Sequence, residues 1–149
     1  MSRTVKFIVF VLLPGVVVFA GYYIYSRAAV TSAHAEAEKK LDGIYMVRGT
    51  GTLTSEMVRE RVSERMKALG LEVRSADVDV HFETLDDENI HELPAQVRMG
   101  MDLTSELQGD EMEMHVLKIK FPLVIRKGLV KRRYVVERVF GFKGIVEDY

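Results

Sequence analysis

The sequence contains no cysteine and no tryptophan, and neither sign of charge dominates it. Without cysteine, the chain can form no disulfide, no thiolate nucleophile and no thiolate zinc site. Its 21 lysines and arginines stand against 22 aspartates and glutamates, so the formal net charge of -1 creates no overall field that attracts nucleic acid or acidic substrates. Hydrophobic residues make up 48% of the chain, as in ordinary globular proteins, so most of it is expected to fold.

One long apolar run stands near the start of the chain, because residues 7–25 include no charged side chain. As a helix, these roughly 19 residues extend about 28 Å, close to the thickness of the hydrocarbon layer of a bilayer. Pro14 lies inside the run and predicts a kink rather than a break, since transmembrane helices tolerate proline. Tyr22, Tyr23 and Tyr25 gather at the end of the run, where membrane proteins place interfacial aromatic residues. The pattern predicts a transmembrane helix over residues 7–25.

Lysine and arginine near this run predict how the chain is oriented in the membrane. Arg3 and Lys6 precede the run, whereas Arg27 follows it, at the same interface as the three tyrosines, before a mostly neutral stretch. Positive charge is retained on the cytoplasmic side of a membrane. We therefore expect residues 1–6 to form a cytoplasmic tip and the C-terminal part to lie outside the cytosol. The expected location is a bacterial inner (cytoplasmic) membrane.

A cleavable signal peptide is the competing interpretation of the same run. Residues 18–21, VFAG, offer small residues before a cleavage point after Ala20. Such a cut would leave Tyr22 and its neighbouring tyrosines at a new N-terminus, and the run is longer than a typical signal core. We favour the retained anchor and keep a secreted or periplasmic binding domain, released by cleavage, as the alternative.

Residues 26–43 predict a helical stalk that continues the membrane helix outward. They are rich in alanine, glutamate and lysine, which favour helix, and Gly43 provides a stop. Alanine occupies every fourth position from Ala29 to Ala37, so these methyl groups share one face of the helix. Because methyl groups bury little area, we expect the segment to be a stalk or a contact surface for other helices, and not part of a core.

Residues 44–149 have the pattern of one α+β domain. Residues 54–69 predict a helix, with Thr54 as its cap and Gly70 as its stop. We expect this helix to pack on one face of a small antiparallel meander sheet of about four strands. The strands are predicted over residues 77–83, 97–103, 112–125 and 129–142.

The third predicted strand, residues 112–125, carries two irregularities. Its apolar alternation slips at Val116 and Leu117, and a slip of one residue reverses every later side chain. The slip therefore predicts a bulge or a bend at that point. Pro122 has no N–H for a ladder hydrogen bond, so it predicts an edge position or a bulge.

A basic cluster lies at the turn between the last two predicted strands and is the most distinctive feature of the chain. Its five positive charges suit lipid headgroups, an acidic partner or a nucleic-acid backbone, or they only protect a sheet edge from aggregation. For a domain outside the cytosol we expect no nucleic acid. The cluster consists of Arg126, Lys127, Lys131, Arg132 and Arg133.

Other candidate chemistry is sparse. His81, Glu83 and His115 allow a small metallo-hydrolase as a second alternative, but the spacings H-x-x-x-H and H-E-x-x-H do not occur. The acidic segment around Asp86 and Glu88 lacks the ligand spacing of a calcium loop. The sequence has no G-x-S-x-G motif and no phosphate-binding glycine loop with its lysine. We therefore expect no enzyme activity, no metal and no cofactor.

The order of an apolar N-terminal helix, an alanine-rich extension and an α+β head resembles the pseudopilin-like single-pass proteins of bacterial envelopes. Within the head, SEMVRERVSERMKALGLEV followed by DVDVHF is similar to the helix-then-strand core of such families. The chain departs from true pilins because it lacks the glycine–aromatic junction and the early glutamate of a type IV prepilin. The resemblance implies no catalytic residues.

The expected organisation is a cytoplasmic tip over residues 1–6, a transmembrane helix over 7–25, a stalk over 26–43 and an extracytoplasmic domain over 44–149. We expect a single-pass, membrane-anchored, non-catalytic subunit or assembly factor of an envelope or membrane protein complex. It would act through protein–protein contacts. Its expected partners are membrane lipid and other membrane or envelope proteins, and its oligomeric state is open.

Overall fold

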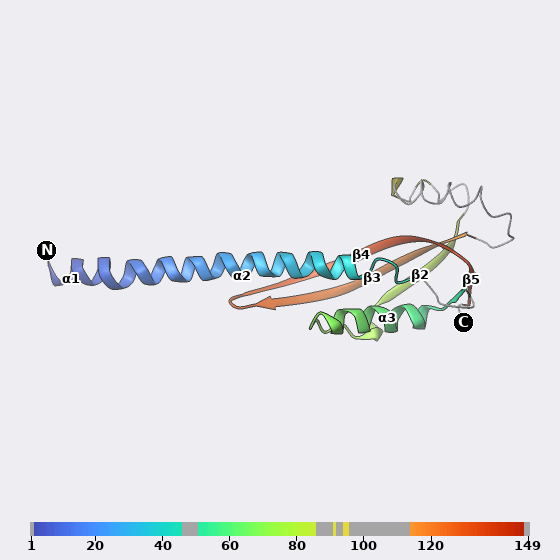
Figure 1. Ribbon diagram of the computed structural model, residues 1–149, viewed down its shortest axis with the longest axis horizontal. Coiled ribbons are helices and arrows are strands. Elements are labelled where there is room, and N and C mark those ends of the chain that lie inside the picture. Colours follow the sequence, from blue (N-terminus) through green and yellow to red (C-terminus); the bar gives the residue numbers. More distant parts are fainter. Residues whose placement is uncertain (1, 46–50, 86–90, 92–93, 96–113, 148–149) are drawn as a thin grey trace.

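The computed structural model describes residues 2–45, 51–85, 91, 94–95 and 114–147. Within these ranges the chain forms a long N-terminal apolar helix, a second helix, a three-stranded antiparallel sheet and a small parallel strand pair. Figure 1 shows an elongated molecule in which the N-terminal helix extends far beyond the rest of the fold. The α+β class expected from the sequence is confirmed.

The N-terminal helix is continuous over Arg3–Lys40, a length of 38 residues. It consists of α1, Arg3–Phe7, a π-helical turn, Ile8–Leu12, and α2, Leu13–Lys40. The π-helical turn ends just before Pro14, and such turns let a helix absorb a missing backbone donor. The helix therefore passes Pro14 without a break, as predicted, and it is long and apolar enough to cross a membrane.

The exposure of this helix changes abruptly near residue 25. Every side chain over residues 3–25 is exposed, including the large apolar ones. Ser26 is only 1% exposed, and Val30 and Leu41 are fully buried. The helix thus has a bare apolar part, residues 3–25, and a packed part, residues 26–40. The boundary between them lies where the sequence predicts the end of the membrane span.

The second helix, α3, covers Ser55–Ala68 and begins and ends as predicted. The side-chain oxygen of Thr54 accepts a hydrogen bond from the backbone N–H of Met57 at 3.2 Å, which caps its first turn. Gly70 adopts a positive φ of 72° just after its end. A short 3-10 helix, Ser75–Asp77, then leads into the sheet.

The antiparallel sheet has the order β2-β3-β4. Its strands are β2, Asp79–Thr84, β3, Met114–Lys127, and β4, Val130–Lys143. All three match predicted strands within a few residues. The remaining predicted strand, residues 97–103, lies outside the described residues, so the meander has three strands within the described part of the chain.

A parallel pair joins the start of the head to its end. In this pair β1, Thr52–Leu53, lies beside β5, Ile145–Val146. The N–H of Ile145 donates to the carbonyl of Gly51 at 3.1 Å, and the N–H of Glu147 donates to the carbonyl of Leu53 at 3.2 Å. The sequence does not predict this pair, because two-residue strands carry no periodicity.

The predicted bulge in β3 is wrong. All 14 residues of β3 pair with β4 in an uninterrupted register, and the register with β2 is also unbroken. The apparent slip arises because both faces of the sheet are covered with apolar side chains at this end. Leu117 belongs to the main core, whereas Val116 packs on the opposite face with Leu85, Met114 and Val139.

Pro122 occupies an edge position, as predicted. The last pair between β3 and β2 joins Lys120 to Asp79, two positions before the proline. Beyond that pair, β4 is the only strand that pairs with β3 within the described residues. The β3–β4 hairpin therefore continues alone past the end of β2, and Figure 1 shows it lying alongside α2.

The packed part of α2 belongs to the main core, so the prediction that this segment stays outside a core is wrong. Val30, Ala37 and Leu41 are fully buried in the same cluster as the apolar residues of α3 and the sheet. The ring of His34 stacks on Tyr134 of β4 at a centroid distance of 4.0 Å. The small alanine side chains let the hairpin approach the helix closely, a role that their small area alone does not suggest.

The end of α2 is also tied to the head by polar contacts. Arg65 of α3 donates to the backbone carbonyls of Lys40 and Asp42 at 2.7 and 2.8 Å, which satisfies carbonyls at the end of the helix. Arg138 of β4 donates to the carboxylate of Asp42 at 2.6 Å. The stalk is thus fixed to the head along its buried face and at its end.

Candidate membrane-proximal interaction site

A two-residue turn, Gly128 and Leu129, joins β3 to β4 between the paired residues Lys127 and Val130. Gly128 has a φ of 55°, and no other residue of the turn has a positive φ. This is the arrangement of a type II′ turn, in which glycine takes the first central position. The turn therefore closes a straight hairpin with a narrow tip.

The tip of the hairpin touches α2 at Tyr22 and Ser26. A Cβ atom placed on Gly128 would lie 2.5 Å from Ser26 Oγ and 2.6 Å from the hydroxyl oxygen of Tyr22. The absence of a side chain on Gly128 therefore permits this contact. Tyr22 and Ser26 stand on either side of the boundary between the bare and the packed parts of the helix, so the tip lies at that boundary.

Replacement of Gly128 by alanine is expected to destabilise the protein more than replacement of Gly70. Both glycines have positive φ values, 55° and 72°, which cost an alanine about 1–2 kcal/mol. Only at Gly128 would the new Cβ also overlap side chains of α2, because nothing lies within 4 Å of a Cβ at Gly70. Thermal unfolding of the two full-length variants measures the difference. Equal midpoints for Gly128→Ala and Gly70→Ala would show that the tip does not pack on the helix.

The five residues of the basic cluster divide between the two faces of the hairpin. Residues directly opposite each other in a sheet share a face, and Arg126 is opposite Lys131. Because side chains alternate, Arg133 joins these two on the face turned away from the core. Lys127 and Arg132 lie on the other face, which further along the hairpin packs on α2.

The predicted interface residues on the helix are all exposed. Tyr22, Tyr23 and Tyr25 are 49%, 44% and 71% exposed, and Arg27 is exposed as well. Tyr22 and Tyr25 line a groove of about 580 Å³ between α2 and the tip, together with Lys127. The structure therefore brings residues of the two predicted groups, far apart in the sequence, to the same place.

Some basic residues of the head have acidic partners, whereas none of the five cluster residues has one within the described residues. Arg138 contacts Asp42 at 2.6 Å and Lys118 contacts Glu83 at 2.9 Å. A hydrogen bond from Arg74 to Asp77, with the charge of that carboxylate, raises the pKa of Arg74. Across the described ranges, no carboxylate forms an ion pair with any of the five cluster residues.

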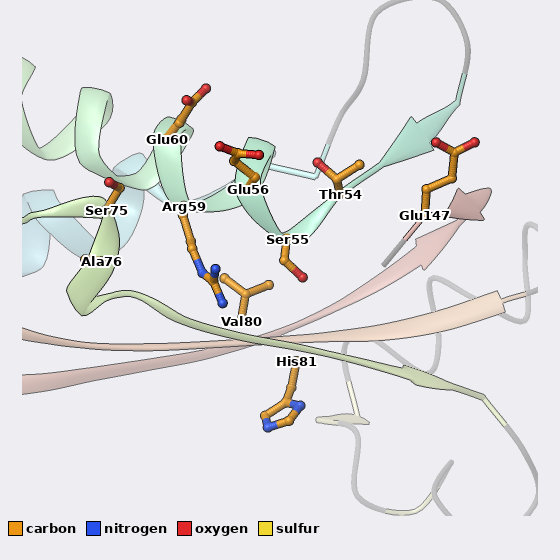
Figure 2. A pocket seen from close by; sticks show the side chains of 10 residues that line it. All are labelled: Thr54, Ser55, Glu56, Arg59, Glu60, Ser75, Ala76, Val80, His81 and Glu147. Carbon is orange, nitrogen blue, oxygen red and sulfur yellow. The ribbon is translucent and has the colours of Figure 1, made fainter. Parts of the chain in front are cut away.

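A second hollow, of about 820 Å³, lies where α3 approaches β2 (Figure 2). Its polar groups already serve the fold, because the Thr54 oxygen caps α3 and Arg59 donates to the carbonyl of Val78 at 3.1 Å. Figure 2 shows Val80 pointing toward α3 and His81 pointing to the other side of β2. No pattern in the sequence indicated this hollow, since its lining comes from four separate segments of the chain.

The three residues of the metallo-hydrolase alternative do not converge. His81 and Glu83 share a face of β2, but the carboxylate of Glu83 accepts a hydrogen bond from Lys118 Nζ at 2.9 Å. His115 is opposite Thr84, which places it on the other face, and its ring lies 6.3 Å from that of Phe142. The acidic segment with Asp86–Glu88 and Glu92, considered for calcium, falls outside the described residues.

No family model, no curated protein and no solved structure matches this chain. The resemblance to pseudopilin-like proteins therefore rests on the order of elements alone. That order is a long apolar helix, then α3, then β2.

Proposed function

We propose that this protein is a single-pass, membrane-anchored, non-catalytic subunit or assembly factor of a bacterial envelope or membrane protein complex. One observation carries the proposal: the bare apolar part and the core-forming part belong to one unbroken helix. Apolar side chains exposed all around a helix need lipid or other membrane helices to cover them. The core of the head therefore includes the continuation of the helix that anchors it.

Retention of the apolar segment fits this arrangement better than cleavage. A cut after Ala20 would fall inside a continuous helix and would leave an exposed apolar end on the released domain. That end comprises Tyr22, Tyr23, Ile24 and Tyr25, which are 44% to 71% exposed. A released periplasmic binding domain stays as the second candidate, because small residues do precede that point.

The proposed orientation places the N-terminus in the cytosol and the head outside, in the bacterial inner membrane. Arg3 and Lys6 support it, because charges close to the span set the orientation. In this orientation the basic cluster lies on the extracytoplasmic side, where the β3–β4 hairpin brings it close to the end of the span. It lies far along the chain from the span, and such distant charges contribute little to orientation.

The exposed side of α2 above the bilayer is the surface that we propose for protein partners. Ala28, Thr31 and Ala35 line a shallow hollow of about 570 Å³ on this side, beside Ile24 and Arg27. Small side chains allow another helix to approach closely, especially where the helices continue into a membrane. A partner helix could thus follow α2 from the bilayer into the space beside the head.

Purification in mild detergent, followed by mass spectrometry, tests the proposal. The full-length protein is expected to co-elute with one or more membrane or envelope proteins. An Ala35→Trp variant is expected to lose them, because a large side chain fills the hollow, whereas Glu64→Ala on the exposed side of α3 is expected to retain them. Elution of the wild-type protein alone as a monomer would contradict a role as a subunit.

A further inference from the structure

The hairpin tip lies at the depth of lipid headgroups if residues 7–25 span the bilayer. Gly128 lies beside Tyr22 and Ser26, and these two residues are separated by about 6 Å along a helix axis. The headgroup layer on each side of a bilayer is about 5–7 Å thick. The span ends between these two residues, so the turn is placed within or directly against this layer.

The charges of the tip are arranged for an external anion. Arg126 and Lys131 are directly opposite each other, where like charges destabilise a strand pair, and Arg133 lies next along the same face. Nearby anions would relieve this repulsion. Within the described part of the chain no carboxylate does so, although other basic residues of the head have acidic partners.

Exposed apolar side chains lie among these charges. Leu129 stands at the turn and is 52% exposed, while Val124 and Val135 on the two strands are 44% and 62% exposed. Val124 is directly opposite Arg133, so apolar and basic side chains share one face. Mixed apolar and basic surfaces are typical of segments that rest in the membrane interface.

We infer that the basic tip of the β3–β4 hairpin binds the anionic phospholipid headgroups of the bilayer that holds its own N-terminal helix. Arg126, Lys131 and Arg133 contact headgroup phosphates, and Leu129 enters the interface. The inference rests on the proposed function in one respect, that residues 7–25 are embedded in the membrane. If the tip binds lipid in this way, the head rests on the membrane surface in one orientation. The exposed side of α2 then stays accessible to protein partners.

Protection of a sheet edge explains the positions of these basic residues less well than lipid binding does. Edge protection needs charges along the open edge of a strand. Here three charges gather on one face, at the end of the hairpin that touches the membrane-proximal part of α2. An acidic protein would satisfy the same charges, but its binding would not depend on the lipid composition. A comparison of neutral and anionic membranes therefore separates these cases.

The absence of native cysteine allows one fluorescent probe to be attached at a chosen position. We would label Leu129→Cys at the tip and, as a control position, His81→Cys, which is exposed on β2 away from the tip. Each full-length protein is placed in nanodiscs of phosphatidylcholine alone or of phosphatidylcholine mixed with phosphatidylglycerol. Lipids that carry a quencher at the headgroup level report whether the probe is at the membrane surface.

The tip probe is expected to be quenched in anionic nanodiscs and much less in neutral ones, whereas the control probe is not quenched in either. Each basic residue near an anionic surface shifts the ratio of bound to free tip about fivefold. The combined variant Arg126→Gln, Lys131→Gln and Arg133→Gln should therefore lower that ratio on the order of 100-fold. Its matched control removes three exposed charges elsewhere: Lys39→Gln, Lys67→Gln and Lys120→Gln. This control is expected to behave like the wild-type protein, and circular dichroism verifies that both variants are folded.

Equal quenching of the tip in neutral and anionic nanodiscs would overturn the inference. So would quenching that the three glutamine substitutions at the tip leave unchanged, or quenching that appears only when another protein is added. In each of these cases the protein co-purifies with the nanodiscs, so the anchor itself stands. Failure of the protein to enter any nanodisc would contradict the proposed function, and the inference with it.

Discussion

A chain that starts at residue 26 is expected to fold as a soluble head, whereas a chain that starts at residue 44 is expected to remain unfolded. The shorter chain lacks Val30, Ala37 and Leu41, which are fully buried in the main core. Burial of each larger side chain contributes about 1.5–3 kcal/mol, and the hairpin face that they cover would also become exposed. The combined loss is comparable with the whole stability of a typical domain, about 5–15 kcal/mol.

Urea unfolding followed by circular dichroism measures this difference. The chain over residues 26–149 should show one cooperative transition, and the chain over 44–149 should show none. A cooperative transition with the same midpoint in both chains would mean that α2 only stands beside the head. The domain that folds independently would then begin at residue 44, as the sequence suggests.

An aspartate in place of Val30 is expected to lower the stability by about 3–5 kcal/mol, because it leaves an unpaired charge in the core. Val30 is fully buried where α2 packs on the sheet. For a head of this size the thermal midpoint should fall by about 10–20 °C. Differential scanning calorimetry of the full-length protein in detergent measures the shift.

The neighbouring substitution Thr31→Asp provides the control. Thr31 is exposed on the same helix, and threonine and aspartate have similar helix propensities, so little change is expected. A small and equal effect of Val30→Asp and Thr31→Asp would contradict the packing of α2 on the hairpin. A large effect of both would point to loss of the helix itself.

Local signals in the sequence predicted the helices and the strands well. Thr54 and Gly70 mark the two ends of α3, and cap and stop residues act within a single turn of the chain. The alternation over residues 77–83 likewise predicts that Val78 and Val80 share one face, and both are buried. These features depend on neighbours close in sequence, which is why the sequence alone was sufficient.

The role of the stalk could not be predicted in the same way. Its alanines and Val30 look like a weak apolar stripe, and only the position of the β3–β4 hairpin turns that stripe into part of the core. The error at Val116 has a related cause, because a strand covered on both faces loses the alternation on which the prediction relied. Tertiary contacts decided both cases.

The basic cluster was visible in the sequence, but its place in the molecule was not. A strand of 14 residues extends about 45 Å, enough to reach from the far end of the head back to the turn of α2 that contains Tyr22 and Ser26. The sequence predicts the length of the hairpin but not its direction relative to the helix. The contact of Gly128 with Tyr22 and Ser26 supplies that direction.

We propose that the apolar segment stays embedded in lipid and carries a head packed onto its continuation. Intact-mass measurement of the protein extracted from its native membrane tests this claim most directly. We expect a single species that retains residues 5–25 and is found only in the membrane fraction. A mature chain that begins at Gly21 would contradict it.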